Sequence, residues 1–204
     1  MVKGYKYLNS LNNKRETSQG PLIGRRKFIR MGLITTAAAA LVPCDALASA
    51  YESVSGVREL HLYNVSTHEN LKITYWKEGW YIPEALAEIN HIFRDYRTGK
   101  VKAIKKELLD LLFNISKNIA VDEPFHIISG YRSPGSNALL RKQNKSAAKN
   151  SLHMYGKAVD IRMPGFSLRK LRQEAMKLGK GGVGYYPRAR SIHIDTGEVR
   201  YWRG

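Results

Sequence analysis

The segment Ser151–Asp160, SLHMYGKAVD, holds His153 and Asp160 seven residues apart. A second segment, SIHID at Ser191–Asp195, contributes His193. Two imidazoles and one carboxylate make a three-ligand set suited to zinc, with a fourth position left for water. The spacing differs from the i, i+4 histidine pair of a helical HExxH motif, so His153 is expected in a loop before a turn. The two segments together predict a metal site assembled from distant parts of the chain.

Both segments contain a predicted strand. The apolar run Ala158–Ile161 indicates a buried strand, and a carboxylate there needs a cationic partner, so Asp160 should pair with zinc or with Arg162. In the second segment His193 and Asp195 alternate with two isoleucines, which places both polar side chains on one face. Histidine and aspartate satisfied by hydrogen bonds in a core would give the same pattern. Spacing alone leaves the metal site and this structural alternative open.

The chain has 204 residues and a formal net charge of +17. Eight of its 34 basic residues and two of its 17 acidic residues fall within residues 1–50, which leaves a net charge of +11 on the remainder. Such a charge suits a nucleic-acid binder, a membrane-surface protein or a ligand of anionic polymers. The length allows one domain with an appendage.

The N-terminal region carries the features of an export signal. A basic segment, Gly24–Arg30, contains the arginine pair Arg25 and Arg26. A short apolar segment follows at Met31–Val42, and small residues occupy Ala48–Ala50. Twelve uncharged residues are too few for a comfortable membrane span, although an uncleaved anchor is the alternative. The arginine pair is typical of a twin-arginine signal, which exports proteins already folded. We therefore predict a signal peptide over 1–50 and a single domain over 51–204.

Cys44 is the only cysteine of the chain, and it lies in the predicted signal peptide. Leu41–Pro43 before it fit a lipoprotein motif poorly. Cleavage after Ala50 would leave 154 residues without a cysteine, so the domain cannot use disulfides. A domain of this size buries roughly 68–70% of the surface of its unfolded chain and needs none.

Periodicity and turn residues predict a mixed set of elements along the domain. In chain order they are a hairpin over 59–65 and 71–76, helices over 83–97 and 104–119, a strand over 125–129, a helix from Pro134, a strand over 158–161, a helix over 167–178 and a strand over 191–195. The glycine-rich run 179–184 lacks the phosphate-loop pattern and is expected to form a tight crossing beside the metal site, with a tyrosine edge.

Arg132 is the main candidate for contact with substrate. It follows the predicted strand 125–129, and Ser133 as cap with Pro134 as first helical residue would start the next helix. A strand-to-helix corner is a favourable position for a residue that meets a ligand. The alternative is an arginine that pairs with a neighbouring carboxylate.

Four segments together resemble one protein family. They read INHIFRDYRTGK, SGYRSPGSNALLRK, KNSLHMYGKAVDIRMPG and GGVGYYPRARSIHIDTGEVRYW. The similarity runs from about Arg58 to Trp202, and the twin-arginine signal is a further point of agreement. The sequence is similar to the murein endopeptidase K family, which belongs to a larger group of zinc D,D-carboxypeptidase and peptidoglycan-peptidase domains related to the hedgehog signalling fold.

The resemblance implies an α+β fold, a small hedgehog/D,D-peptidase-like domain with a central antiparallel sheet and flanking helices. It implies a Zn²⁺ ion held by His153, Asp160 and His193, with Arg132 facing the substrate. The implied substrate is the peptide part of the bacterial cell wall, with a preference for L,D cross-links between two diaminopimelate residues. With the export signal, this gives a periplasmic zinc metallopeptidase.

The general base is the open assignment of this site. Many relatives carry an acid or a histidine just upstream of the last ligand, whereas this chain has Arg190 and Ser191 there. Asp195, on the strand face of His193, is the nearest candidate base, unless it only orients the ligands. Arg132 and Asp195 are therefore the predicted catalytic residues.

Three alternatives to an endopeptidase remain. A carboxypeptidase would use the same site, and a non-catalytic zinc or cell-wall-binding module would lack a base. A nucleic-acid binder rests on charge alone, and the export signal argues against it. We expect peptidoglycan cross-links and the twin-arginine export machinery as partners, no nucleic acid, membrane contact only through the signal segment, and a monomer.

Overall fold

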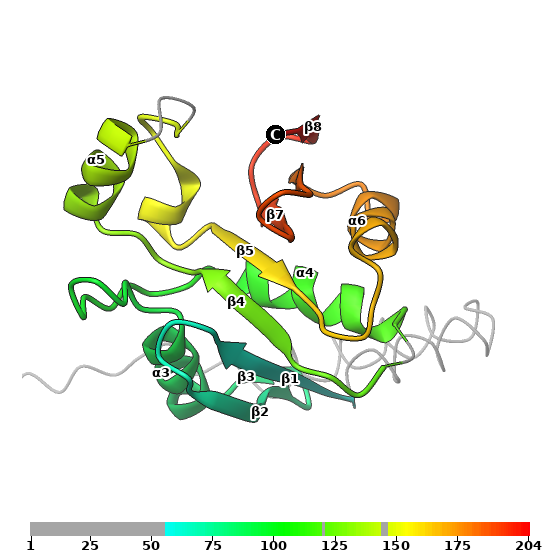
Figure 1. The fold of residues 1–204 in the computed structure, drawn as a ribbon. Helices are drawn as coiled ribbons and strands as arrows, with labels where there is room; N and C mark the ends of the chain where they lie inside the picture. Colours follow the sequence, from blue (N-terminus) through cyan, green and yellow to red (C-terminus); the bar gives the residue numbers. More distant parts are fainter. Residues whose placement is uncertain (1–55, 120, 144–146) are drawn as a thin grey trace, which may run out of the picture. The chain divides into compact units, whose positions relative to one another are not determined.

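The structure is a computed structural model that describes residues 56–119, 121–143 and 147–204. The predicted signal peptide and Cys44 lie outside these ranges. The elements in chain order are β1 (Val57–Asn64), β2 (Asn70–Lys77), β3 (Trp80–Tyr81), α3 (Pro83–Ile92), α4 (Lys106–Lys117), β4 (Phe125–Ser129), α5 (Pro134–Gln143), the 3₁₀ helix η1 (Leu152–Tyr155), β5 (Ala158–Arg162), α6 (Leu168–Lys177), β6 (Gly182–Tyr186), β7 (Ser191–Asp195) and β8 (Arg200–Arg203) (Figure 1). No helix in the described ranges combines the length and the apolar character needed to cross a membrane.

The strands form one mixed sheet in the order β3-β2-β1-β4-β5-β7-β6-β8. The class α+β is confirmed, but the prediction of an antiparallel sheet is wrong at two places. β1 pairs with β4 in parallel and β6 pairs with β8 in parallel, while the other neighbours are antiparallel. Parallel neighbours need a crossover, and the segment containing α3 and α4 supplies it between β1 and β4.

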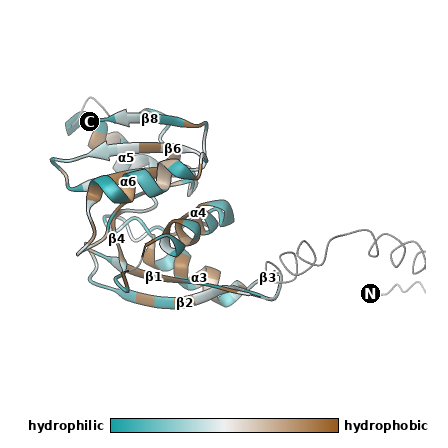
Figure 2. Cartoon of the chain, turned by 90° about the vertical axis from the view of Figure 1, so that its right-hand side faces the viewer, coloured by the Kyte–Doolittle hydropathy of each residue, from teal (hydrophilic) through white to brown (hydrophobic). Residues whose placement is uncertain are grey.

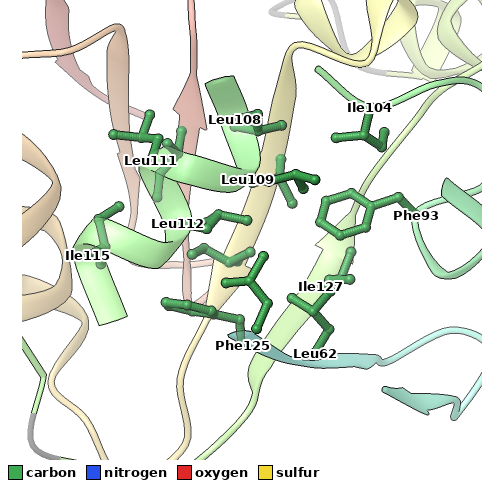
Figure 3. Close-up of a cluster of buried hydrophobic side chains, with 14 of the residues drawn as sticks. Leu62, Phe93, Ile104, Leu108, Leu109, Leu111, Leu112, Ile115, Phe125 and Ile127 are labelled. Carbon is green, nitrogen blue, oxygen red and sulfur yellow. The ribbon is translucent and has the colours of Figure 1, made fainter. Parts of the chain in front are cut away.

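One face of the sheet is apolar and helix-covered. α4 packs against β1, and α6 packs against β6 and β7. Figure 3 shows Leu112 of α4 directed toward the cluster that contains Leu62, Phe125 and Ile127, all of which are buried. Each such side chain contributes about 1.5–3 kcal/mol through burial. Figure 2 shows hydrophobic residues gathered on α4 and hydrophilic residues along α6.

The opposite face carries the polar residues of the predicted site. Along β5, Val159 and Ile161 are buried in the core, so Asp160 between them points to the other side of the sheet. Along β7, Ile192 and Ile194 do the same for His193. The alternation of side chains along these strands therefore places the core residues on one face of the sheet and the site residues on the other.

The predicted helices form, with differences at their ends. α3 begins at Pro83 as predicted but ends at Ile92, so Tyr96 lies beyond the helix and is 43% exposed. Ser133 caps α5 as predicted, since its Oγ accepts the backbone N–H of Ser136 at 3.3 Å. The glycine-rich run was expected to be a crossing, whereas its second half forms strand β6.

Candidate metal centre

The structure brings His153, Asp160 and His193 together from η1, β5 and β7. Asp160 and His193 are direct partners across the antiparallel pair β5–β7. His193 Nδ1 lies 2.9 Å from Asp160 Oδ1, and His153 Nε2 lies 3.4 Å from Asp160 Oδ2 and 3.2 Å from His193 Nδ1. One ligand atom from each residue falls within 4.8 Å of the others. Strand pairing and the turn of η1 thus converge three donor atoms on one point.

The outer nitrogen of each imidazole already has a hydrogen-bond acceptor. His153 Nδ1 lies 2.8 Å from the carbonyl oxygen of Gly130, and His193 Nε2 lies 2.9 Å from Asp195 Oδ2. Because a carbonyl and a carboxylate only accept, these outer nitrogens carry the hydrogens. Each neutral imidazole then turns a lone pair toward the other and toward Asp160. A proton on His193 or a metal cation can satisfy these facing lone pairs and the carboxylate, and the donor set fits a divalent metal such as zinc.

Ionisation of the site follows from the same contacts. Burial would lower the pKa of His193, but hydrogen bonds to Asp160 and Asp195 outweigh it and raise the pKa to about 9. Burial would raise the pKa of Asp160, but the neighbouring His153 and His193 outweigh it and hold that pKa well below its usual range. The metal-free site therefore retains a proton on His193 at neutral pH.

This predicts a proton release on metal binding. Below about pH 9 the metal-free His193 is protonated, and a metal can take Nδ1 only after that proton leaves; above pH 9 there is none to displace. Zinc binding at pH 7 should release about one proton from His193. Calorimetry in buffers of different ionisation enthalpy measures it, and the release should shrink as the pH passes 9. A release that does not change across this range would contradict the assignment.

Asp195 is fully buried behind His193. Its Oδ1 accepts the backbone N–H groups of Gly182 at 3.0 Å and Gly197 at 2.8 Å. Arg200 adds a two-pronged contact, with Nη1 3.2 Å from Oδ1 and Nη2 2.6 Å from Oδ2. Burial would raise the pKa of Asp195, but the bonds from His193, Gly197, Arg200 and Gly182 lower it overall. Asp195 thus stays charged and holds the His193 ring.

Sequence reasoning missed Arg200, because it did not identify the turn between β7 and β8 that returns Arg200 to Asp195. The same reasoning offered zinc or Arg162 as the partner of Asp160, and the Arg162 alternative is wrong, because no ion pair joins the two among the described residues. The groups beside Asp160 are the two imidazoles and the guanidinium of Arg132, whose Nη2 lies 3.8 Å from Oδ2.

Glycines on β6 make room for this arrangement. A Cβ at Gly182 would lie 2.6 Å from Asp195 Oδ2 and 2.7 Å from Arg200 Nη1. A Cβ at Gly184 would lie 2.6 Å from the Trp202 ring, which packs 5.3 Å from the His193 ring. The expected close backbone approach beside the site is confirmed, although it is made by a strand.

Arg132 lies beside the three donors and is only 9% exposed. Its guanidinium donates to Ser129 Oγ at 3.1 Å and to Asn137 Oδ1 at 3.3 Å, and its backbone N–H donates to the carbonyl of His153 at 3.3 Å. Burial lowers the pKa of Arg132, with Asp160 acting in the opposite direction. A guanidinium remains charged under these conditions. The corner thus presents a fixed cation next to the candidate metal position.

Asp95 holds the backbone next to Arg132, at the corner between β4 and α5. It is 1% exposed, and its Oδ2 accepts the backbone N–H of Ser133 at 2.9 Å. Burial would raise its pKa, but hydrogen bonds from Ser133, Ser136 and Arg97 outweigh it and lower the pKa to about 2. The RDYRTG segment therefore supports Arg132, which is a role that its sequence did not indicate.

A cleft of about 550 Å³ opens over the centre. Its lining includes Arg132, His153, Asp160, Tyr186, His193, Arg200 and Trp202. The Tyr186 hydroxyl accepts the Trp202 indole N–H at 2.8 Å. A second cavity of about 390 Å³, lined by Glu107 and Asp110 among others, contains none of the three donors. The chemistry therefore belongs to the first cleft.

Comparison with known proteins identifies the family. The profile of the family described as peptidoglycan L,D-endopeptidase MepK matches residues 52–202. The chain belongs to this family. The MepK protein of Escherichia coli is 40% identical over 178 residues, which cover 87% of this chain and 96% of the relative. A probable MepK of Haemophilus influenzae is 36% identical over 181 residues, covering 88% and 96%.

A more distant similarity extends beyond the MepK family. The zinc D-Ala-D-Ala carboxypeptidase of Streptomyces albus G is 29% identical over 123 residues, which cover 57% of this chain and 46% of that protein. The resemblance to the MepK family and to zinc peptidases in general is thereby confirmed. The name of this relative includes zinc, in agreement with the donor set of the cleft.

Proposed function

We propose that this protein is a zinc-dependent murein endopeptidase that hydrolyses L,D peptide cross-links of peptidoglycan. The observation that carries the proposal is the convergence of His153 Nε2, His193 Nδ1 and the Asp160 carboxylate in the cleft of a chain that belongs to the MepK family. Two acceptors fix the outer nitrogens, so the lone pairs are directed before any metal arrives.

In this proposal His153, Asp160 and His193 hold the zinc. When bound, zinc lowers the pKa of a water ligand and polarises a carbonyl oxygen. Arg132 binds a substrate carboxylate or the oxyanion that develops at the carbonyl, through charge-assisted hydrogen bonds. Its guanidinium is already fixed by Ser129 and Asn137, so little ordering remains to be done when substrate arrives.

Asp195 is proposed as the residue that orients His193, and not as the base. Its carboxylate contacts Nε2 on the side of the ring away from Asp160, and it is fully buried. Among the lining residues that belong to the described part of the chain, Asp160 is the only carboxylate. The Tyr186 hydroxyl and solvent are then the groups left to take or relay the proton.

Substitution of Asp195 distinguishes these roles. In Asp195→Asn we expect zinc affinity to fall by about 10- to 100-fold, because the amide no longer fixes the donor nitrogen of His193. Arg200→Gln should also lower the zinc affinity, but by a smaller factor. Arg203→Gln, on the same strand but without contact to Asp195, is the matched control. Normal zinc affinity with turnover at least about a hundredfold slower would instead identify Asp195 as the base.

The decisive test of the function is product analysis. Zinc-loaded protein is incubated with purified muropeptides that carry either an L,D cross-link between diaminopimelate residues or an uncross-linked stem peptide. An endopeptidase separates the first into two stems and leaves the second intact, as mass spectrometry of the products shows. Release of a terminal amino acid from the second would indicate a carboxypeptidase. Failure to cleave either would indicate a non-catalytic module.

We further propose that the protein acts as a monomer in the periplasm after twin-arginine export. The support is the arginine pair and short apolar segment of residues 25–42, together with a substrate that lies outside the cytoplasm. Replacing Arg25 and Arg26 by lysine should leave the precursor in the cytoplasm, as cell fractionation would show. Normal export of this variant would exclude the twin-arginine route.

A further inference from the structure

The net positive charge of the domain comes from the C-terminal half of its sequence. Residues 51–123 contain ten Lys/Arg and eleven Asp/Glu, whereas residues 124–204 contain sixteen and four. Two of those four acids, Asp160 and Asp195, belong to the metal centre. A third, Glu174, pairs with Lys177 on α6 at 2.7 Å. The half that builds the cleft therefore has almost no carboxylate to balance its cations.

Five exposed cations are sequence neighbours of residues that line the cleft. Each cation is one or two positions away from a residue that lines the cleft. These lining residues are Leu140 at the end of α5, Ala148 and Asn150 before η1, and Ala189 in the turn between β6 and β7. We call them the rim cations, and they are Arg141, Lys142, Lys149, Arg188 and Arg190. Within the described ranges, none of them forms an ion pair.

The turn that carries two of them is strained. Arg190 has φ of 51°, in the left-handed region, where a residue other than glycine costs about 1–2 kcal/mol. Like charges that crowd one half of a domain also repel one another. Neither feature helps the fold, and backbone strain of this kind concentrates at ligand sites.

We propose that the rim cations bind carboxylates of the peptidoglycan polymer on both sides of the cleft. The inference rests on the proposed function, because an anion held at both rims lies across the metal centre. Stem peptides of peptidoglycan carry free carboxylates, so a cross-linked sheet presents them repeatedly. The rim cations lie outside the row of lining residues, and they therefore meet stems beyond the bond that is cut. Their attraction also speeds encounter with the polymer.

The test compares a large and a small substrate. Zinc-loaded protein is assayed for kcat/KM on insoluble purified peptidoglycan and on a short soluble muropeptide that ends at one cross-link. The turn variant is Arg188→Gln with Arg190→Gln, and the α5 variant is Arg141→Gln with Lys142→Gln. The matched control is Arg169→Gln with Lys170→Gln, which removes the same charge from the exposed side of α6, on the opposite face of the sheet.

Each rim variant should lose about fivefold or more on the insoluble polymer, as expected for two exposed ionic contacts. It should stay within about twofold of wild type on the short muropeptide, and the control should match wild type on both substrates. The difference on the polymer should shrink in 0.5 M salt, which shortens the range of exposed charges from about 10 Å to a few ångströms. Arg190→Gly removes a charge and relieves the left-handed backbone, so a loss in this variant is not explained by unfolding.

Three results would overturn the inference. Equal losses in the control and rim variants would show that only total charge matters. Full activity of both rim variants on the polymer would show that the rims do not bind it. Rim-dependent binding to anionic phospholipid vesicles, without a rim-dependent loss on peptidoglycan, would assign these residues to a membrane surface. Failure of the wild type to cleave even the short muropeptide would instead refute the proposed function itself.

Discussion

Replacing His153 by alanine is expected to abolish both zinc binding and hydrolysis of cross-linked muropeptides. The change removes Nε2, which lies 3.2 Å from His193 Nδ1 and 3.4 Å from Asp160 Oδ2. Two remaining donors do not make the three-residue set of a catalytic zinc. Several kcal/mol of transition-state stabilisation are lost with the metal, so turnover should fall by about a thousandfold or more. Metal analysis of the purified protein and mass spectrometry of the products measure the two effects.

The His153→Ala protein should nevertheless fold. Apart from its contacts to the other two donor residues, the ring makes a hydrogen bond to the Gly130 carbonyl, and losing that bond costs about 1 kcal/mol. Circular dichroism should therefore match wild type. His91→Ala is the matched control, since His91 is largely exposed on α3, away from the centre. A His153→Ala protein with full zinc content and full activity would refute the metal assignment.

Replacing Arg132 by alanine is expected to reduce turnover by about 10²–10³ while zinc affinity stays unchanged. Arg132 is held beside the centre by Ser129 and Asn137, but it contributes no metal ligand. Its loss therefore removes a cation that acts on the substrate or the oxyanion. Arg132→Lys should recover only part of the rate, because an ammonium does not reproduce the planar fork of a guanidinium.

Separate measurement of kcat and KM locates the effect of Arg132. A fall in kcat indicates contact with the oxyanion, and a rise in KM alone indicates contact with a substrate carboxylate. Arg169→Ala on the exposed side of α6 serves as control. If Arg132→Ala loses zinc instead, Arg132 stabilises Asp160 across their 3.8 Å separation, and the proposed role in substrate binding is wrong.

The strands that carry the site could be predicted because their alternating hydrophobic pattern determines which side chains face the core. Ile192 and Ile194 must face the core, so His193 and Asp195 share a face at any sheet position. The same local signals gave Pro83 as the start of α3 and Ser133 as the cap of α5. β8 was missed because Arg200–Arg203 has no apolar alternation and is held by its pairing with β6.

The contacts behind the ligands could not be predicted, because they join segments that are distant in sequence or pass through turns. The Gly130 carbonyl reaches His153 only when β4 lies beside η1, and Asp95 reaches Ser133 across 38 residues. Arg162, two residues from Asp160, was the obvious local partner, yet its strand position is opposite His126. Sequence distance was a poor guide to charge pairing here.

The sequence by itself determined the class of chemistry. Two histidines and an aspartate at this spacing are compatible with a metal site, and the order of the motifs identifies a family that favours it over a hydrogen-bonded core. Only the tertiary structure decided which nitrogen of each histidine faces the metal position and whether Asp195 stands in front of His193 or behind it. Those choices depend on hydrogen bonds between strands and turns, which form only when the sheet has assembled.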